Sequence, residues 1–280
     1  MTAPQDGRRG SLELAGRTVI VTGASSGLGA ALALELAAQG SDVVLFSPEE
    51  EKLQAVAARC GERGAGALAV VGDVTRPEDC SLLVERTVGR FGRLDCLVAN
   101  AGISMWSRFD QVQDLGVFRR LMEVNYLGAV HCVHYALPHV KANRGLIVAI
   151  TSIQARISVP LHSGYVASKH ALQGFCETLR MELAGSGVGV LTVMPHWLRG
   201  TDLRRNALAA DGGVVGSASR RHSRESVGVE EACQAILRAM RQRRRNLVIP
   251  WKLQALLVLG ALHPGLADRI VMRAVRQQEE

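Results

Sequence analysis

TVIVTGASSGLGAALALELAA, residues 18–38, is the most informative stretch of the chain. It joins an apolar run, residues 18–22, to a glycine-rich turn, residues 23–29, and then to an apolar helical pattern, residues 30–38. In such a turn small residues let the backbone approach a pyrophosphate, and the helix offers its N-terminal amides and positive dipole end to that charge. The alternative is a turn that only packs a helix against a strand. The position between strand and helix favours the dinucleotide site.

The alternation of short apolar runs with helical patterns continues to residue 249, which indicates repeated βα units. We therefore predict an α/β protein with a Rossmann-type, doubly wound parallel sheet in a three-layer α/β/α arrangement. Strands are expected at residues 18–22, 42–46, 67–71, 94–99, 146–151, 189–193 and 246–249. The domain is expected over residues 16–250, between a flexible tail, 1–15, and an apolar and basic helical extension, 251–280. Within it, residues 196–228 are rich in glycine and polar residues and are expected to form a lid loop.

The composition suits one intracellular domain without a metal. Hydrophobic residues make up 48% of the 280 residues and aromatic residues only 4%, so the core is expected to be mostly aliphatic. The six cysteines show neither a C-x-x-C pair nor metal-ligand spacing, which argues against disulfides and a metal site and favours a reducing compartment. Residues 1–15 lack the apolar run of a signal peptide, so a cytoplasmic protein is expected.

The net charge of +7 is due almost entirely to arginine and is uneven along the chain. Arg220, Arg221 and Arg224 form one basic group, and residues 241–245 form another. Such groups favour an anionic surface as partner, whereas a bias toward arginine codons is the simpler alternative. We expect no nucleic acid as partner.

The end of the second strand bears on the choice of dinucleotide. Dinucleotide-binding folds often place a carboxylate there, about 20 residues after the glycines, to hold the adenosine ribose 2'-hydroxyl. Here the strand ends in Phe46-Ser47-Pro48, and glutamates occupy residues 49–51. No acid at the strand end repels a 2'-phosphate, and no Arg or Lys there binds one. NAD and NADP therefore both fit, with NADP slightly favoured.

Two further motifs follow predicted strands. Asp73 follows the third strand, and Asn100-Ala101-Gly102 follows the fourth. Both are therefore expected at the strand ends where open α/β sheets bind ligands. For Asp73 the alternative is a cap on the helix expected to begin near Pro77.

Ser152, Tyr165 and Lys169 are the candidates for chemistry. Tyr165 and Lys169 are four residues apart in a predicted helix, so they share one helical face. A phenol is a poor base at neutral pH, but an adjacent ammonium group and an oxidised nicotinamide would favour the phenolate. Ser152, at the end of the fifth strand, is expected to donate a hydrogen bond to the substrate oxygen while the cofactor carries the hydride. The alternative for Tyr165 and Lys169 is an ordinary pair on a helix surface.

Together, the turn at residues 22–29, Asn100-Ala101-Gly102, Asn125, Ser152 and the segment 165–169 resemble the short-chain dehydrogenase/reductase family in order and spacing. The resemblance covers roughly residues 14–249 and implies an NAD(P)-dependent oxidoreductase that interconverts an alcohol and a carbonyl.

The resemblance also implies roles for single residues. Tyr165 would be the acid/base, Lys169 would hold the nicotinamide ribose and lower the pKa of the tyrosine, Ser152 would steady the substrate oxygen, and Asn125 would position a water for proton relay. For Asn125 the alternative is a helix-breaking residue that satisfies local backbone groups. The residues expected to contact the cofactor are Gly23, Ser25, Ser26, Gly27, Leu28, Gly29, Ser47, Asp73, Val74, Asn100, Ala101, Gly102, Tyr165, Lys169, Pro195 and Thr201. The family forms dimers or tetramers, so a homodimer or homotetramer is expected.

One segment departs from the family pattern. Members usually have Pro-Gly after the sixth strand, packed against the nicotinamide, and a threonine a few residues later. This chain has Pro195-His196-Trp197, and Thr201 comes one place late. A side chain therefore enters a site where backbone normally approaches closely. His196 either contacts the substrate or points outward, and Trp197 either walls an apolar pocket or packs beneath the lid.

The C-terminal extension combines apolar and basic residues. Pro264 is expected to divide it into two short helices. The first apolar run, residues 253–262, is far shorter than the roughly 20 residues that cross a bilayer. Trp251 and Lys252, with Arg269, Arg273 and Arg276, give it the flanks of an interfacial segment, so a peripheral contact with an anionic membrane is one expectation. A dimer contact or a lid over the substrate mouth is the alternative.

Within the family, the extension together with residues 152–154 and 168–170 most resembles the branch that contains 11β-hydroxysteroid dehydrogenases and dehydrogenase/reductase member 7-like proteins. That branch often acts on lipophilic carbonyls, so the expected substrate is a steroid, a retinoid or a fatty ketone or aldehyde. The alternatives are a 3-oxoacyl thioester reductase and a catalytically silent, cofactor-binding membrane scaffold.

Overall fold

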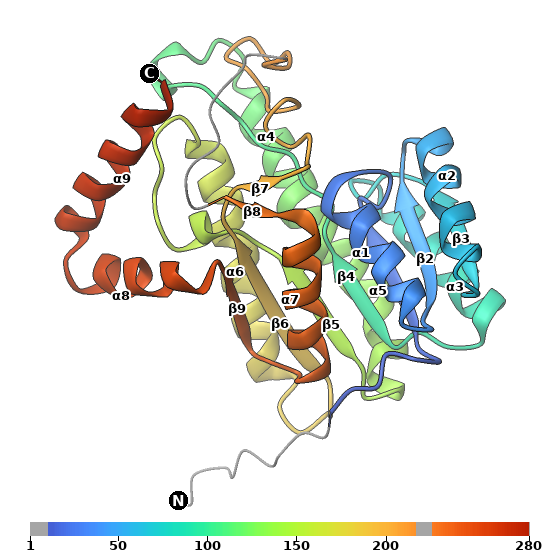
Figure 1. Ribbon diagram of the computed structural model, residues 1–280. Coiled ribbons are helices and arrows are strands. Elements are labelled where there is room, and N and C mark those ends of the chain that lie inside the picture. The colour runs from blue at the N-terminus through green and yellow to red at the C-terminus, as the bar shows by residue number, and fades with distance from the viewer. Residues whose placement is uncertain (1–10, 217–225, 280) are drawn as a thin grey trace, which may run out of the picture.

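A computed structural model describes residues 11–216 and 226–279 and has the predicted doubly wound architecture (Figure 1). Its seven-stranded sheet is parallel throughout and has the strand order β3-β2-β1-β4-β5-β6-β9. The strands are β1 Thr18–Thr22, β2 Asp42–Ser47, β3 Ala67–Val71, β4 Cys96–Ala99, β5 Leu146–Ile150, β6 Gly189–Pro195 and β9 Asn246–Ile249. The predicted strands are confirmed, with ends that differ by at most two residues.

Helices cover both faces of this sheet. The α-helices are α1 Gly27–Ala38, α2 Glu50–Gly61, α3 Pro77–Phe91, α4 Gly116–Met122, α5 Gly128–Ala142, α6 Ser163–Glu182, α7 Val229–Arg241, α8 Gln254–Leu262 and α9 Pro264–Glu279. A π-helical turn, η2 Glu123–Leu127, joins α4 to α5, and a short 3-10 turn, η3 Ile153–Ala155, follows β5. Pro264 divides the C-terminal extension into two helices, as predicted.

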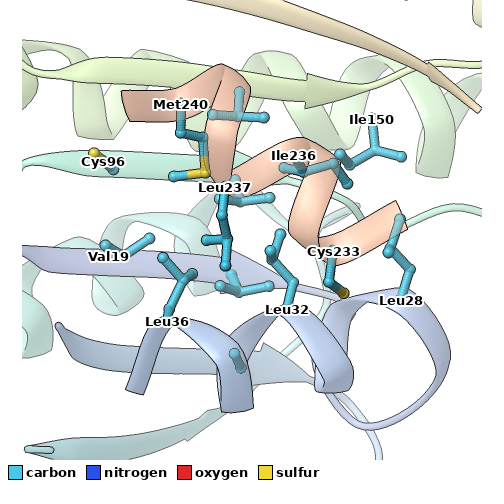
Figure 2. Packing of buried hydrophobic residues seen from close by; sticks show 14 of the residues in the cluster. Val19, Leu28, Leu32, Leu36, Cys96, Ile150, Cys233, Ile236, Leu237 and Met240 are labelled. Carbon is cyan, nitrogen blue, oxygen red and sulfur yellow. The ribbon is translucent and has the colours of Figure 1, made fainter. Parts of the chain in front are cut away.

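The core lies in two layers because alternate strand residues point to opposite faces. In β1, Val19 and Val21 belong to the cluster formed with α1, α2 and α7, whereas Ile20 belongs to the cluster formed with α3, α5 and α6. Figure 2 shows the first layer, in which Leu32 and Leu36 of α1 meet Ile236 and Leu237 of α7 over one face of the sheet. The strands read as continuous apolar runs because both of their faces are buried.

Residues 1–15 were predicted to form a flexible tail, and this prediction is wrong for residues 11–15, which the structure describes. Leu12 and Leu14 are buried, and the Leu12 amide donates to the carbonyl of Arg241 over 2.7 Å. Ser41 also donates to the Leu14 carbonyl. Both leucines belong to the core cluster formed with α1, α2 and α7, and burial of their apolar side chains stabilises this position of the segment. Residues 1–10 lie outside the described residues.

The segment expected to be a lid loop contains regular structure. A short parallel pair, β7 Leu198–Arg199 and β8 Val227–Gly228, ties its two ends together. Leu208 is buried and forms bridges to Met105 and Val214. Residues 217–225, with Arg220, Arg221 and Arg224, lie outside the described residues, as does the side chain of Arg276.

Candidate active site

A cavity of about 450 Å³ lies at the carboxyl ends of the strands. Its walls are the glycine turn, the segments that follow β2, β3 and β4, and the segments that follow β5 and β6. The strand order reverses between β1 and β4 within this region, and open α/β sheets bind ligands at such a reversal. The fold thus gathers motifs that are far apart in the sequence around one space.

Nearly all of the predicted site residues line this cavity. Those that do are Gly23, Ser25, Ser26, Gly27, Leu28, Ser47, Asp73, Val74, Asn100, Ala101, Gly102, Ser152, Tyr165, Lys169, Pro195, His196, Trp197 and Thr201. Gly29 and Asn125 lie just behind the wall, next to Gly23 and Gly102 respectively.

The glycines of the turn have no room for side chains. A Cβ atom on Gly29 would lie 2.2 Å from the Gly23 carbonyl oxygen, and one on Gly23 would lie 2.9 Å from the Ala101 Cα. Gly23 and Gly27 also have positive φ angles of 63° and 55°, which glycine adopts without strain. The turn therefore presents bare backbone to the cavity at the start of α1, where a pyrophosphate is stabilised by amides and the helix dipole.

Asn100 braces this turn from the neighbouring strand. Its side-chain amide donates to the carbonyls of Thr22, over 2.9 Å, and Gly23, over 3.3 Å. In return, the Thr22 hydroxyl oxygen accepts the backbone amides of Asn100 and Ala101, each over 3.0 Å. Thr22 was not among the predicted site residues, although its place at the end of a strand was an available signal.

Asp73 does not cap the helix that follows it. Its carboxylate accepts the Thr75 amide over 2.9 Å, while the residue before α3 is Arg76. The Asp73 amide donates to Asp79 of that helix. These contacts fix the turn after β3, so that Asp73 and Val74 form one wall of the cavity.

An acid that sequence reasoning passed over lies near the end of β2. Glu49, two residues beyond Ser47, lines the same cavity, and its carboxylate accepts a hydrogen bond from Ser25 of the glycine turn over 2.6 Å. The slight preference for NADP was predicted because no acid ends the strand. In the structure, however, the hydrogen bond from Ser25 holds the carboxylate of Glu49 close to the end of β2, although the two residues are 24 positions apart in the sequence.

Ser152 and Tyr165 come together from two elements. Ser152 follows β5 in an extended conformation, where its hydroxyl accepts the Gln154 amide over 3.1 Å and donates to the Pro195 carbonyl over 3.4 Å. Tyr165 lies in the first turn of α6 and is 94% buried against Met105 and its neighbours. Burial raises the pKa of the Tyr165 phenol to about 12, and a side-chain hydrogen bond with Ser152 acts in the opposite direction.

Lys169 lies one helical turn beyond Tyr165 on the buried face of α6. Its ammonium group is 5.7 Å from the centre of the Tyr165 ring and donates to the Ile150 carbonyl over 3.0 Å. Burial lowers the pKa of Lys169 to about 8. The alternative of an ordinary surface pair is wrong, because both side chains are buried. Burial therefore raises the pKa of Tyr165 by more than the nearby ammonium group lowers it.

Asn125 is fully buried in the π-helical turn η2. Its side chain accepts the Ile103 amide over 2.8 Å and donates to the Ile103 carbonyl and to the Ser168 hydroxyl, each over 2.9 Å. These partners are remote in sequence, so Asn125 does not merely satisfy local backbone, and the helix continues through it. Single π-turns often mark functional positions, and this one locks the loop after β4 to the residue beside Lys169.

His196 and Trp197 line the end of the cavity beyond Tyr165, with Arg204. The Arg204 guanidinium carbon is 4.6 Å from the centre of the Trp197 ring, and the Trp106 and His162 rings complete an aromatic cluster. Burial, helped by the positive charge of Arg204, lowers the pKa of His196 to about 4, so this imidazole is neutral at physiological pH.

The residues present fit a nicotinamide dinucleotide. The bare turn suits the pyrophosphate, and Thr201, next to Gly27, continues the wall toward the catalytic candidates. The six cysteines are all free and buried. Among residues 11–216 and 226–279, no three His, Cys, Asp or Glu side chains gather as metal ligands would.

Comparisons with known proteins agree with this site. Residues 17–212 match a family model described as short chain dehydrogenase. The 11-beta-hydroxysteroid dehydrogenase A of Sesamum indicum is 41% identical over 189 residues, which are 67% of this chain and 54% of that protein. The chain thus matches about half the length of that relative.

Two solved structures share the fold. A short chain dehydrogenase/reductase from Burkholderia phymatum in complex with NAD has a TM-score of 0.78 and 24% identity, over 91% of this chain and 96% of that one. An alcohol dehydrogenase from Thermococcus sibiricus complexed with 5-hydroxy-NADP has a TM-score of 0.71 and 23% identity, over 83% and 95% of the two chains.

Proposed function

Because the chain belongs to the short-chain dehydrogenase/reductase family, we propose that it interconverts a lipophilic alcohol and its ketone or aldehyde, with a steroid as the leading substrate class. It is an oxidoreductase of that family, with a nucleotide cofactor and a small-molecule substrate. The observation that carries the proposal is the convergence of Ser152, Tyr165 and Lys169 on one cavity beside the bare glycine turn.

The proposed division of labour follows from the geometry. Ser152 donates a hydrogen bond to the substrate oxygen, and Tyr165 gives that oxygen its proton or removes it. A phenol with a pKa of about 12 is protonated at neutral pH, as carbonyl reduction requires. When bound, the nicotinamide supplies or accepts the hydride.

Lys169 and Asn125 serve this exchange without touching the reacting carbon. Below its pKa of about 8 Lys169 carries a positive charge, which favours the phenolate left when Tyr165 gives up its proton. Asn125 forms hydrogen bonds with the backbone of Ile103, in the loop after β4, and with the Ser168 hydroxyl of α6. It thereby fixes the position of α6 relative to that loop. A role for Asn125 in a water relay stays a prediction.

Two observations support a lipophilic substrate. Ile153, Trp197 and Leu203 line the same cavity as Ser152 and offer apolar surface. The relative from Sesamum indicum is named a hydroxysteroid dehydrogenase. The presence of Arg204 in the same part of the cavity favours, as the second candidate, an acyl thioester whose carrier is anionic.

A substrate panel tests the proposal. Purified protein is incubated with steroid ketones and alcohols, retinal, medium-chain aldehydes and 3-oxoacyl thioesters, and the nicotinamide absorbance is followed with NAD(H) and NADP(H). We expect turnover of the lipophilic ketones or alcohols. Turnover of acyl thioesters alone would replace the first candidate by the second, and turnover of neither class would contradict both.

We also propose that the enzyme is a peripheral membrane protein of the cytoplasmic side, which docks through α8 and α9. No helix in the part of the chain that the structure describes is long and apolar enough to span a bilayer. The exposed apolar side chains of these helices are Val258, Leu262, Leu266, Ile270 and Met272. Arg269 and Arg273 are exposed beside them, as an anionic lipid surface would favour. A homodimer or homotetramer stays a prediction.

A further inference from the structure

The end of the cavity next to β2 contains a chain of hydrogen bonds that starts at the strand and finishes on a carboxylate. The hydroxyl of Ser47, the last residue of β2, donates to the Ser25 hydroxyl over 3.0 Å. Ser25 donates to a carboxylate oxygen of Glu49 over 2.6 Å, and the Glu49 amide donates back to Ser47 over 3.3 Å. Both serines are buried, so the chain holds Glu49 against the glycine turn.

The carboxylate of Glu49 is ionised there. Its second oxygen accepts a hydrogen bond from the Lys52 ammonium group over 2.5 Å. The hydrogen bonds from Lys52 and Ser25 hold the pKa of Glu49 below its usual value, and burial opposes them only in part. Because 46% of the side chain is still exposed, the carboxylate is open to a ligand as well as held by the protein.

The charge around this carboxylate is negative on balance. Glu50 and Glu51 follow in the first turn of α2, and Lys52 is the one cation among residues 46–53. Of the described residues that line the cavity, only Lys169 and Arg204 are cationic, and both belong to the substrate end. A 2'-phosphate at this end would therefore meet Glu49 without an arginine clamp.

From this arrangement we infer that Glu49 is the residue that holds the adenosine ribose 2'-hydroxyl and excludes a 2'-phosphate, so that the enzyme selects NAD over NADP. In dinucleotide-binding folds the acid for this hydroxyl usually comes from the end of the second strand. Ser47 occupies that place here, and through Ser25 it holds an acid that comes two residues later. The inference rests on the proposed dehydrogenase function and reverses the slight preference for NADP that the sequence alone predicts.

Lys52 is the residue through which the enzyme could instead prefer NADP. If the lysine left Glu49 and bound a 2'-phosphate, NADP would be preferred. The ion pair opposes this, since the ammonium group already lies on the carboxylate. Replacing Glu49 by glutamine removes the repulsion and releases Lys52 at the same time, so the two changes act in the same direction.

Equilibrium binding tests the inference without any turnover. Isothermal titration calorimetry compares ADP-ribose with 2'-phospho-ADP-ribose on the wild-type enzyme and on Glu49→Gln, Lys52→Gln and Glu51→Gln. We expect the wild-type enzyme to bind ADP-ribose at least about tenfold more tightly, because like charges in the complex are costly. Glu49→Gln should reduce this ratio about tenfold, and Lys52→Gln should keep a preference for ADP-ribose. Glu51→Gln removes the same charge from a residue without a contact to Ser25 and should leave the ratio unchanged.

The outcomes separate this inference from the proposed function. Tighter binding of 2'-phospho-ADP-ribose by the wild-type enzyme, or an unchanged ratio in Glu49→Gln, would overturn the role of Glu49 even if carbonyls are turned over. The expected ratios without turnover of any carbonyl or alcohol would leave this role standing and overturn the proposed function. Failure of the wild-type enzyme to bind either probe would overturn the role of Glu49, whereas the substrate panel would still decide the proposed function.

Discussion

Tyr165 and Lys169 show how burial alone shifts two acids in opposite senses. Removal from water disfavours whichever form carries the charge, so the phenol pKa rises to about 12 and the ammonium pKa falls to about 8. The two pKa values thereby move apart, although Nζ of Lys169 lies only 5.7 Å from the centre of the Tyr165 ring. At neutral pH the phenol therefore keeps the proton that carbonyl reduction needs, beside a lysine that is still largely charged.

Tyr165→Phe tests the proposed acid/base. The phenylalanine ring keeps the packing against Met105 and Leu121 and loses only the transferable proton. We expect kcat to fall by about 10²–10⁴-fold, while the dinucleotide dissociation constant and the melting temperature change little. Tyr135→Phe, on α5 and outside the cavity, is the matched control and should behave as the wild type. A Tyr165→Phe enzyme with nearly normal kcat would contradict the mechanism.

Lys169→Met tests the cost of burying a charge. The folded pKa of Lys169, about 8, lies below the ordinary value of 10.5. Between these values the unfolded chain binds the proton that the folded chain has lost, so this lysine makes stability rise with pH. The stability of the wild type relative to Lys169→Met should therefore increase by about 2 kcal/mol from about pH 7.5 to about pH 9.5.

The quantity to measure is the difference in unfolding free energy between the wild type and Lys169→Met, because other groups also make stability depend on pH. Burial raises the pKa values of thiols such as Cys60, to about 11, and Cys96, to about 12. A raised thiol pKa makes stability fall as pH rises above the ordinary value of 9.0, and for Cys60 and Cys96, which Lys169 does not influence, it does so equally in both proteins. Urea unfolding of both at the two pH values measures the difference. A gap that does not change with pH would mean that Lys169 is not held in the low-dielectric site described.

At the scale of the elements, glycine is required where α1 begins after β1, but it is not required in the middle of α6. In Gly29→Ala the new Cβ would meet the Gly23 carbonyl oxygen at 2.2 Å, so we expect a loss of stability of about 1–3 kcal/mol or more and loss of dinucleotide binding. In Gly174→Ala, inside α6, nothing lies within 4 Å of the new Cβ, so a gain of about 0.5–1 kcal/mol is expected. Urea unfolding and dinucleotide titration measure both. Equal stability of the two variants would contradict the close packing of the turn.

The elements themselves were largely predictable from the sequence because each strand is a short apolar run and most of the turns contain glycine. The catalytic candidates were predictable for the same reason, since strand ends and the spacing of Tyr165 and Lys169 fix their places. Glu49 was not, because its role depends on a hydrogen bond from Ser25, which periodicity does not reveal. The aromatic cluster around Arg204 was missed likewise, since it joins residues from three separate segments.

Across the whole molecule, the C-terminal helices are joined to the active site. Val271 of α9 packs with Ile153 and Ile157, one and five residues after Ser152, and residues of α8 pack against the same cluster. In Figure 1 the two helices lie beyond β9, at the edge of the sheet opposite β3. They therefore support one wall of the site on their inner side, whatever their outer side contacts. Sequence could not separate these two faces because α8 is apolar almost all round.

The outer side gives the test of membrane docking. Ala267 and Val271 of α9 face the protein, whereas Leu266 and Ile270 are 48% and 45% exposed. We expect the full chain to co-sediment with vesicles that contain phosphatidylserine, and to bind less at high salt without release. Each arginine near an anionic leaflet adds about 1 kcal/mol, and apolar burial adds about 25 cal/mol per Å². Leu262→Ser, Leu266→Ser and Ile270→Ser in one variant should abolish binding. Arg269→Gln with Arg273→Gln should remove its salt dependence.

Point variants are needed here because a chain ending at Pro250 would uncover Ile153 and Ile157 and disturb the site as well as the surface. Val71→Ser with Leu82→Ser is the matched control, since these side chains are 41% and 40% exposed on β3 and α3, at the edge of the sheet opposite β9. That pair should leave vesicle binding intact. If the serine variant of α8 and α9 and the control sediment alike, docking through these helices is wrong. A fall in oligomer size in that serine variant, measured by light scattering, would then assign the exposed apolar side chains to contact with a second copy of the chain.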